Sequence, residues 1–199
     1  MTTEATATPV DGRTRRRRRN VDAVIDAVIE LAAAGHIDPT SEEIAAVAGI
    51  SHRSIYRYFD TRGELLEAAV VRAFETASAE VFDDERLDGS FDERVDRFVS
   101  ARLEIHRRLR SIARVAEAHA SESSTGLERA RSALRTRLAD SFAGEFDQLE
   151  PEDRHLAVPM VDAAFQFQAL EYLSSNAGLD DRSIRKSLAR HLRAHLRPV

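Results

Sequence analysis

A short segment near the end of the first third of the chain is unusually rich in side chains that form hydrogen bonds. From His52 to Tyr58 the sequence reads HRSIYRY, in which only Ile55 is aliphatic. Arginine, serine and tyrosine side chains contact phosphate oxygens, and arginine also pairs with the edge of guanine. These residue types at this spacing predict a surface that contacts nucleic acid.

The flanking residues predict two short helices joined by a tight turn. Thr40 and Glu43 have the spacing of a capping box, which begins a helix. Gly49 can adopt a left-handed conformation without steric cost, so the chain can turn sharply after this helix. Ser51 is expected to cap the next helix through its hydroxyl group. The resulting helix–turn–helix would leave the polar side chains of the second helix exposed.

A cluster of basic residues precedes the first expected helix. It runs from Arg13 to Arg19 as RTRRRRR, and the helix is expected from about Arg16 to Ala34, where Gly35 ends it. The helix macrodipole disfavours positive charge at a helix N-terminus. Helix stability therefore does not explain the arginines, whereas contact with a phosphate backbone would. The alternative is a solvated tail.

Composition is that of an ordinary globular protein and limits the possible functions. The chain has 199 residues, of which 43% are hydrophobic and 32% charged, and it has no cysteine. Disulfides and thiolate metal sites are thus excluded, and a cytoplasmic location is expected. The net charge is −5, although nine arginines oppose nine acidic residues up to Arg62. Contact with nucleic acid must then come from local basic clusters.

The apolar periodicity and several further helix-start patterns predict an all-α chain of about nine helices. No apolar run could span a bilayer, so no membrane partner is expected. Three segments are expected: a disordered basic tail (1–15), a helix–turn–helix DNA-binding domain (16–62) and a larger helical domain (63–199). The further start patterns begin at Thr61, Ser90, Thr125, Pro151 and Asp180.

The segment around the turn resembles the N-terminal DNA-binding domain of the TetR family of transcriptional regulators. The resemblance covers roughly residues 16–70. Its specific part is an aromatic helix end followed by a capped helix with paired leucines. The matching residues are Thr40, Ile44, Ala45, Ala48, Gly49, Ile50, Ser51, Ser54, Ile55, Tyr56, Arg57, Tyr58, Phe59, Arg62, Leu65 and Leu66.

The resemblance implies a recognition helix from about His52 to Tyr58 that enters the major groove. His52 and Arg53 are expected to meet base edges, and contact with phosphate is the alternative for His52. Family members often carry a small residue where Arg53 stands, which leaves the operator sequence open. For Arg57, a solvated surface position is an equal alternative to phosphate contact. The residues expected at the phosphate backbone are Thr40, Ser54, Tyr56, Arg57, Tyr58 and Arg62, with Arg15, Arg16, Arg17 and Arg18 of the basic cluster.

By resemblance, the second domain binds a small molecule and dimerises. The last two helices, expected over 151–177 and 180–196, would pair with those of a second chain, and Pro159 should bend the first of them. The candidates for burial in that interface are Leu156, Met160, Ala164, Phe167, Leu188 and Leu192.

Polar residues on or beside the apolar stripes of this domain are candidates for lining a ligand cavity. They are His106, His119, Gln166, Gln168 and Tyr172. Each could instead be a satisfied core or interface residue. His191 and His195 have a spacing that could hold a metal on one helix face, but no third ligand is evident. No metal and no cofactor are therefore expected.

The function expected from these features is that of a ligand-responsive transcriptional regulator, most simply a repressor. It would bind a palindromic double-stranded DNA operator as a homodimer and leave it when an unidentified small-molecule inducer binds. The chain has no glycine-rich phosphate loop, no HExxH, no GxSxG and no cysteine nucleophile, so it is not expected to be an enzyme. The alternative is a helical dimer that acts through protein contacts only.

Overall fold

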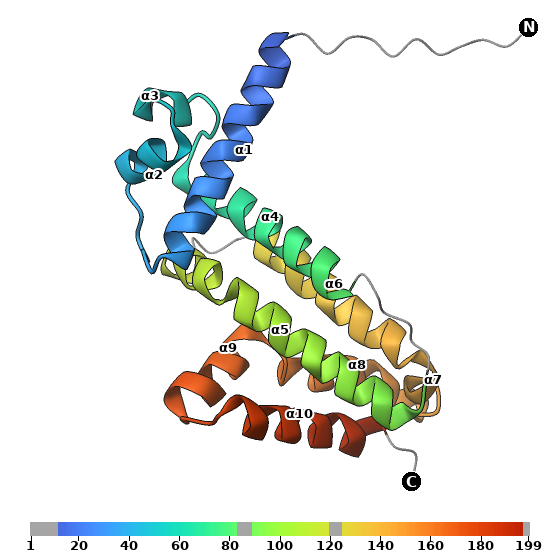
Figure 1. Cartoon of the computed structure of the whole chain (residues 1–199). Coiled ribbons are helices and arrows are strands. Elements are labelled where there is room, and N and C mark those ends of the chain that lie inside the picture. Colours follow the sequence, from blue (N-terminus) through green and yellow to red (C-terminus); the bar gives the residue numbers. More distant parts are fainter. Residues whose placement is uncertain (1–11, 83–88, 120–124, 197–199) are drawn as a thin grey trace, which may run out of the picture.

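The computed structural model describes residues 12–82, 89–119 and 125–196, and within these ranges all regular structure is helical (Figure 1). The all-α prediction is confirmed. The elements are α1 (Gly12–Ala33), α2 (Ser41–Ala48), α3 (His52–Ile55), α4 (Arg62–Phe82), α5 (Phe91–Ala118), α6 (Thr125–Ser141), α7 (Ala143–Phe146), α8 (Pro151–Ala163), α9 (Phe167–Glu171), the π-helical turn η1 (Tyr172–Asn176) and α10 (Asp181–Leu196).

Helix α1 begins earlier than the sequence analysis predicted. It starts at Gly12, so residues 12–15 of the expected disordered tail are helical, whereas residues 1–11 lie outside the described residues. Arginine is a good helix former, and no glycine or proline interrupts the run from Arg13 to Arg19. The basic cluster is therefore held on a helix.

Two glycines end the first two helices in the same way. Gly35 has φ +96°, and the next amide, of His36, donates to the Leu31 carbonyl at 3.0 Å. Gly49 has φ +65°, and the Ile50 amide donates to the Ala45 carbonyl at 3.1 Å. Both are hydrogen bonds of the Schellman motif, which needs a left-handed residue. They turn the chain out of α1 and then into α3.

The core of the N-terminal helices continues into the rest of the molecule. Val28 of α1, Ile44 of α2 and Ile55 of α3 are buried together with Leu65 of α4. The same cluster contains Val115, near the C-terminal end of α5. The boundary expected at residue 62 is therefore crossed by continuous apolar packing.

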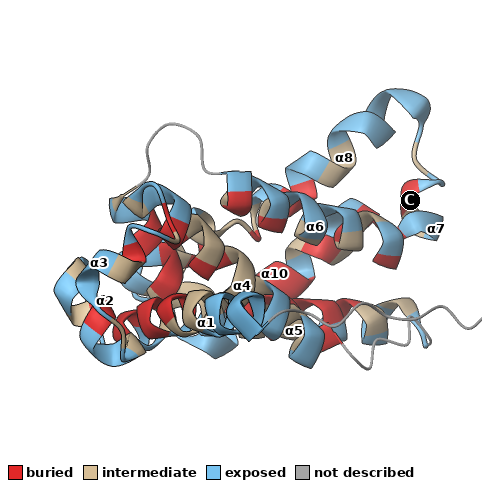
Figure 2. Cartoon of the chain, turned by 90° about the horizontal axis from the view of Figure 1, so that it is seen from above, coloured by how far each residue is buried: buried red, intermediate tan, exposed pale blue. Residues whose placement is uncertain are grey.

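The remaining helices form layers on either side of α5. Helices α4 and α10 pack directly against α5, while α6 packs on α4 and α8 packs against α6 and α10 (Figure 1). A second apolar cluster there contains Phe142 and Leu192, neither of which is exposed to solvent. Most residues of α8 are exposed (Figure 2). One face of α8 therefore has no partner within the described chain.

The single helix expected over 151–177 is wrong, because the structure divides it into α8, α9 and η1. Helix α8 continues for four residues past Pro159 and ends at Ala163. The chain then places Phe165 in the core, where the side chain is 3% exposed. The break is explained by this inward turn, and proline is not its cause.

Two residues expected at a dimer interface lie inside the chain's own core. Leu188 and Leu192 of α10 are 3% and 0% exposed and pack in the second cluster. Leu156 and Met160 of α8 are 53% and 62% exposed. Of the candidates for that interface, only this α8 pair remains substantially exposed: Ala164 is half-buried beside the second cluster, and Phe167 is half-buried too.

Substitution of Gly49 tests the turn between α2 and α3. Gly49→Ala should lower the free energy of unfolding by about 1 kcal/mol, because alanine is strained at this positive φ. Gly144→Ala is the matched control, since Gly144 lies in helix α7 and an added methyl group meets nothing within 4 Å. Chemical denaturation should show no loss for Gly144→Ala. Equal losses in both variants would contradict this account of the turn.

Candidate nucleic-acid interface and ligand cavity

Helix α3 is shorter than predicted but continues as a hydrogen-bonded turn. The α-helix covers only His52–Ile55, after which the Tyr58 amide donates to the Ile55 carbonyl at 2.9 Å. The prediction that Ser51 caps α3 through its hydroxyl group is wrong. That hydroxyl pairs with the Ser54 hydroxyl at 2.8 Å, and the Ser51 carbonyl accepts from the Ser54 amide. Ser54 is thus half-buried and already partnered.

The polar face of α3 is open to solvent. His52, Arg53, Tyr56 and Arg57 are exposed, while Ile55 is 4% exposed and anchors the helix. The edge of the His52 ring meets the Tyr56 ring at 5.0 Å between centroids. The Tyr56 hydroxyl lies 3.2 Å from that of Ser41 on α2. These contacts hold His52 and Tyr56 side by side without burying them.

Tyr58 joins the basic cluster to the turn that follows α3. Its hydroxyl accepts a hydrogen bond of 2.9 Å from the Asn20 side chain of α1. The guanidinium groups of Arg17 and Arg57 lie 6.0 and 5.6 Å from the centre of its ring. Tyr58 is half-buried, so much of it is committed to packing. The basic N-terminal part of α1 therefore lies beside the exposed face of α3.

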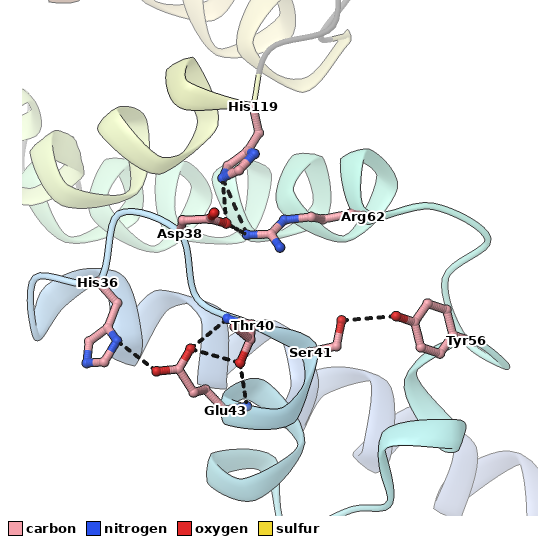
Figure 3. A network of polar contacts seen from close by, with 8 residues as sticks. All are labelled: His36, Asp38, Thr40, Ser41, Glu43, Tyr56, Arg62 and His119. Atoms are coloured by element: carbon pink, nitrogen blue, oxygen red, sulfur yellow. Dashed lines mark hydrogen bonds and ion pairs between the residues drawn. The ribbon is translucent and has the colours of Figure 1, made fainter.

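Thr40 begins α2 with the predicted capping box (Figure 3). Its amide donates to the Glu43 carboxylate at 2.7 Å, and its hydroxyl accepts from the Glu43 amide at 3.2 Å. Hydrogen bonds from Thr40 lower the pKa of Glu43, aided by the nearby His36. Thr40 is exposed and fixed at the edge of the α3 surface.

Arg62 lies at the junction between the N-terminal helices and the rest of the chain. It forms an ion pair with Asp38, in the loop before α2. His119, which follows the last turn of α5, lies 3.1 Å from Asp38 and 3.4 Å from Arg62 (Figure 3). The structure thus places His119 at this junction, and it does not line the cavity among α4, α5, α6 and α9 where a ligand role was expected. The reason is that α5 ends here, so its C-cap residue faces the loop before α2.

A cavity of about 80 Å³ lies among α4, α5, α6 and α9. Two of the expected residues, His106 and Gln166, line it. Gln168 and Tyr172 do not, because Gln168 is exposed and bonded to Glu117, and Tyr172 is 62% exposed. The apolar lining residues are Val70, Phe74, Ile105, Leu109, Ile112, Ala113, Leu127, Ala130, Leu134, Phe165, Phe167 and Leu170.

Arg102 also lines the cavity and was missed by the sequence analysis. Its side chain is almost completely buried, at 3.3 Å from the Asp162 carboxylate. Burial lowers the pKa of Arg102 to about 10, an effect that Asp162 opposes. Its place on the stripe of Val95, Phe98 and Val99 could be read from the helical spacing, but its burial depends on Asp162, which is distant in the sequence.

His106 stands at the polar end of the cavity. Burial lowers its pKa, although Glu171 at 3.3 Å acts in the opposite direction. The imidazole is therefore neutral near pH 7 and can donate or accept a hydrogen bond. Its ring also lies 5.1 Å from the Phe167 ring, which places it against the apolar wall.

The rings of His191 and His195 lie 4.3 Å apart, but the described residues contain no group of three possible metal ligands. Within the same ranges, no helix is both long and apolar enough to cross a bilayer.

The fold places the exposed α3 in a helix–turn–helix, followed by a larger set of helices. Residues 24–69 match the family model described as bacterial regulatory proteins, tetR family. This match confirms the resemblance that the sequence analysis found in the N-terminal segment. No curated protein sequence matches the chain.

Solved structures of proteins named as regulators share the fold over most of this chain. One is a protein from Rhodococcus sp. assigned to the TetR-family transcriptional regulators, with TM-score 0.66 and 18% identity, covering 89% of this chain and 99% of that one. A tetR-family transcriptional regulator from Streptomyces coelicolor has TM-score 0.60, 20% identity and coverage of 90% and 80%. The fatty acid degradation regulator FadR from Bacillus halodurans has TM-score 0.63, 15% identity and coverage of 89% and 94%. All three are named as regulators, and this chain shares their fold.

The two tyrosines at the end of α3 should differ in their effect on stability. Tyr58→Phe should lower the free energy of unfolding by about 1 kcal/mol, because the Asn20 amide loses its acceptor. Tyr56→Phe is the control, with an expected change within about 0.5 kcal/mol, because Tyr56 is 57% exposed. Urea denaturation of both variants would measure this. If Tyr58→Phe leaves the free energy of unfolding unchanged, the hydrogen bond between Asn20 and Tyr58 does not stabilise the fold.

Proposed function

We propose that the chain is a ligand-responsive transcriptional repressor that binds a palindromic DNA operator as a homodimer. The observation that carries the proposal is the continuity of α4. The helix starts with Arg62 at the junction and reaches the cavity wall at Val70 and Phe74. From Arg62 to Phe74 this is about 18 Å of unbroken helix. A change at the cavity can therefore be passed to the DNA-binding helices as a rigid movement.

The exposed face of α3 supports the DNA-binding part of the proposal. His52 and Arg53 start the helix and would meet base edges in the major groove. The residues proposed to contact phosphate are Thr40, Ser54, Tyr56, Arg57, Tyr58, Arg62, Arg15, Arg16, Arg17 and Arg18. The closeness of Arg17 to Tyr58 favours one continuous basic surface along α1 and α3. Such contacts position the protein, while base contacts specify the sequence.

The exposed apolar side chains of α8 support dimerisation. Leu156 and Met160 are four residues apart, so they lie on the same helix face. In a two-fold dimer this face would pack against its own copy, and the two α3 helices would enter the groove about one DNA turn, or a multiple of it, apart. A palindromic operator follows from that symmetry.

The size of the cavity suggests how a ligand could cause release. The cavity of about 80 Å³ is smaller than the roughly 300–1,000 Å³ of ordinary small-molecule pockets. A ligand would therefore favour a state in which α4, α5 and α6 lie further apart. The junction of Arg62, Asp38 and His119 would move with these helices and change the separation of the two α3 helices in the dimer.

Substitution of Arg53 tests base recognition. Arg53→Ala should weaken binding to a selected operator by roughly 10-fold or more, and weaken binding to random DNA much less. Arg57→Ala, as the phosphate-contact control, should weaken both by a similar factor. Operators can be obtained by selection from random duplexes and measured by gel shift. If Arg53→Ala lowers the affinity for operator and for random DNA by the same factor, Arg53 does not take part in base recognition.

Charge introduced on α8 tests the dimer. Met160→Glu should convert a dimer to a monomer, because it places two carboxylates in an apolar interface. Ile37→Glu is the control, since Ile37 is also exposed, at 59%, but lies in the loop before α2. Light scattering after size-exclusion chromatography gives the mass. A dimer that persists in Met160→Glu would place the interface elsewhere.

A further inference from the structure

The cavity is lined by a buried arginine side chain, Arg102, whose hydrogen-bond donors are not all used by the protein. Arg102 comes from the middle of α5, and its side chain is 2% exposed. Its Nη2 donates to the Phe165 carbonyl at 3.0 Å and to the Asp162 carboxylate at 3.3 Å. Its Nη1 is buried and has no hydrogen-bond partner among the described residues. One edge of the guanidinium is therefore bonded, and a buried donor on the other remains unused.

The partner carboxylate is itself shared. Asp162 is 4% exposed and also accepts a hydrogen bond of 2.5 Å from the Gln166 side chain, on its other oxygen. The contact with Arg102 uses a single nitrogen and is not the paired geometry in which two nitrogens meet two oxygens. Asp162 thus balances the charge of Arg102 without saturating its donors.

The other charged side chains at the cavity are engaged elsewhere. Arg131 is 35% exposed and forms an ion pair with Glu128 at 2.9 Å. Glu117 accepts a hydrogen bond from exposed Gln168. Arg102 is consequently the buried charge that a bound molecule would meet, and most of the remaining wall is apolar.

His106 adds a second polar group at this end of the cavity. Its Nε2 is buried without a hydrogen-bond partner among the described residues, although the Glu171 carboxylate lies 3.3 Å away. The chain therefore brings two incompletely bonded nitrogen-bearing side chains, from Arg102 and His106, to one cavity. They are four residues apart on α5 and so lie on the same face of that helix.

We propose that the ligand of this cavity is a small carboxylic acid with an apolar body, and that its carboxylate binds the free edge of Arg102. A buried guanidinium with an unused donor favours an anionic acceptor, because charge-assisted hydrogen bonds are the strong ones. The apolar body would lie against Leu109, Ile112 and Leu134. This proposal rests on the proposed function, since it names the class of the inducer.

The test compares acids with neutral and cationic analogues of the same shape. The probes are benzoate, phenylacetate and octanoate, set against the matched alcohols and amines: benzyl alcohol, 2-phenylethanol and 1-octanol, and benzylamine, 2-phenylethylamine and octylamine. The full-length chain is titrated with each by thermal unfolding and by calorimetry. At least one acid should raise the unfolding temperature by about 5 °C or more at roughly 100 times its Kd, and its alcohol and amine should not.

Two variants assign that preference to Arg102. Because Arg102→Met alone would leave Asp162 buried and unpaired, the double variant Arg102→Met/Asp162→Asn removes both charges and preserves folding. It should lose at least 10-fold in affinity for the acid and bind the alcohol and the acid equally. Arg131→Gln, at the rim, should keep the preference. A double variant that keeps the preference, an amine or alcohol that binds best, or a wild-type chain stabilised by none of the acids would overturn the proposal.

Gel shifts with a selected operator separate this inference from the function on which it rests. If the chain binds operator and no acid stabilises it, the proposed function as a regulator is retained and the proposed ligand class is wrong. If an acid binds through Arg102 but no DNA is bound at low salt, the proposed ligand class is retained and the proposed function as a regulator is wrong. If both hold, the stabilising acid should release the operator from the wild-type chain and fail to release it from Arg102→Met/Asp162→Asn.

Discussion

The apolar cluster between the N-terminal helices and the end of α5 is the constraint on which the rest of the structure depends. The three N-terminal helices α1, α2 and α3, called the head, form too short a segment for a large core of its own, and domains of this size are only marginally stable. Ile112 and Val115 of α5 and Leu65 of α4 complete the core around Val28 and Ile55. The polar junction of Asp38, Arg62 and His119 lies beside this packing. Because the head is held by helices that also form the cavity, its orientation depends on how those helices pack.

The sequence predicted the features that depend on local chemistry. The capping box of Thr40 and Glu43 and the left-handed Gly49 involve residues within a few positions of one another, so their pattern can be read directly. Ile55, the one aliphatic residue from His52 to Tyr58, is the residue of α3 that is buried. Even here the predicted cap by Ser51 is wrong, because its hydroxyl bonds to the Ser54 hydroxyl and not to a backbone amide of α3.

Features that depend on packing between distant segments could not be predicted. His119 and Leu188 lie near apolar stripes in the sequence, yet one faces the loop before α2 and the other faces the chain's own core. Arg102 was overlooked because an arginine on an apolar stripe is ordinarily a surface residue. Its burial depends on Asp162, which is 60 positions away. The break after α8 has the same origin, because Phe165 is drawn into a core made by other helices.

The buried pair of Arg102 and Asp162 also restricts how this chain can diverge. Losing either partner alone leaves an unpaired charge in an apolar interior, which is strongly destabilising, whereas replacing both can be neutral. We therefore expect these two positions to change together among homologues. A lineage that drops the pair would pass in one step from a charged cavity to an apolar one. The class of ligand that the cavity binds would then change abruptly between branches of the family. The residues on the surface of α3 would change gradually and independently of the cavity.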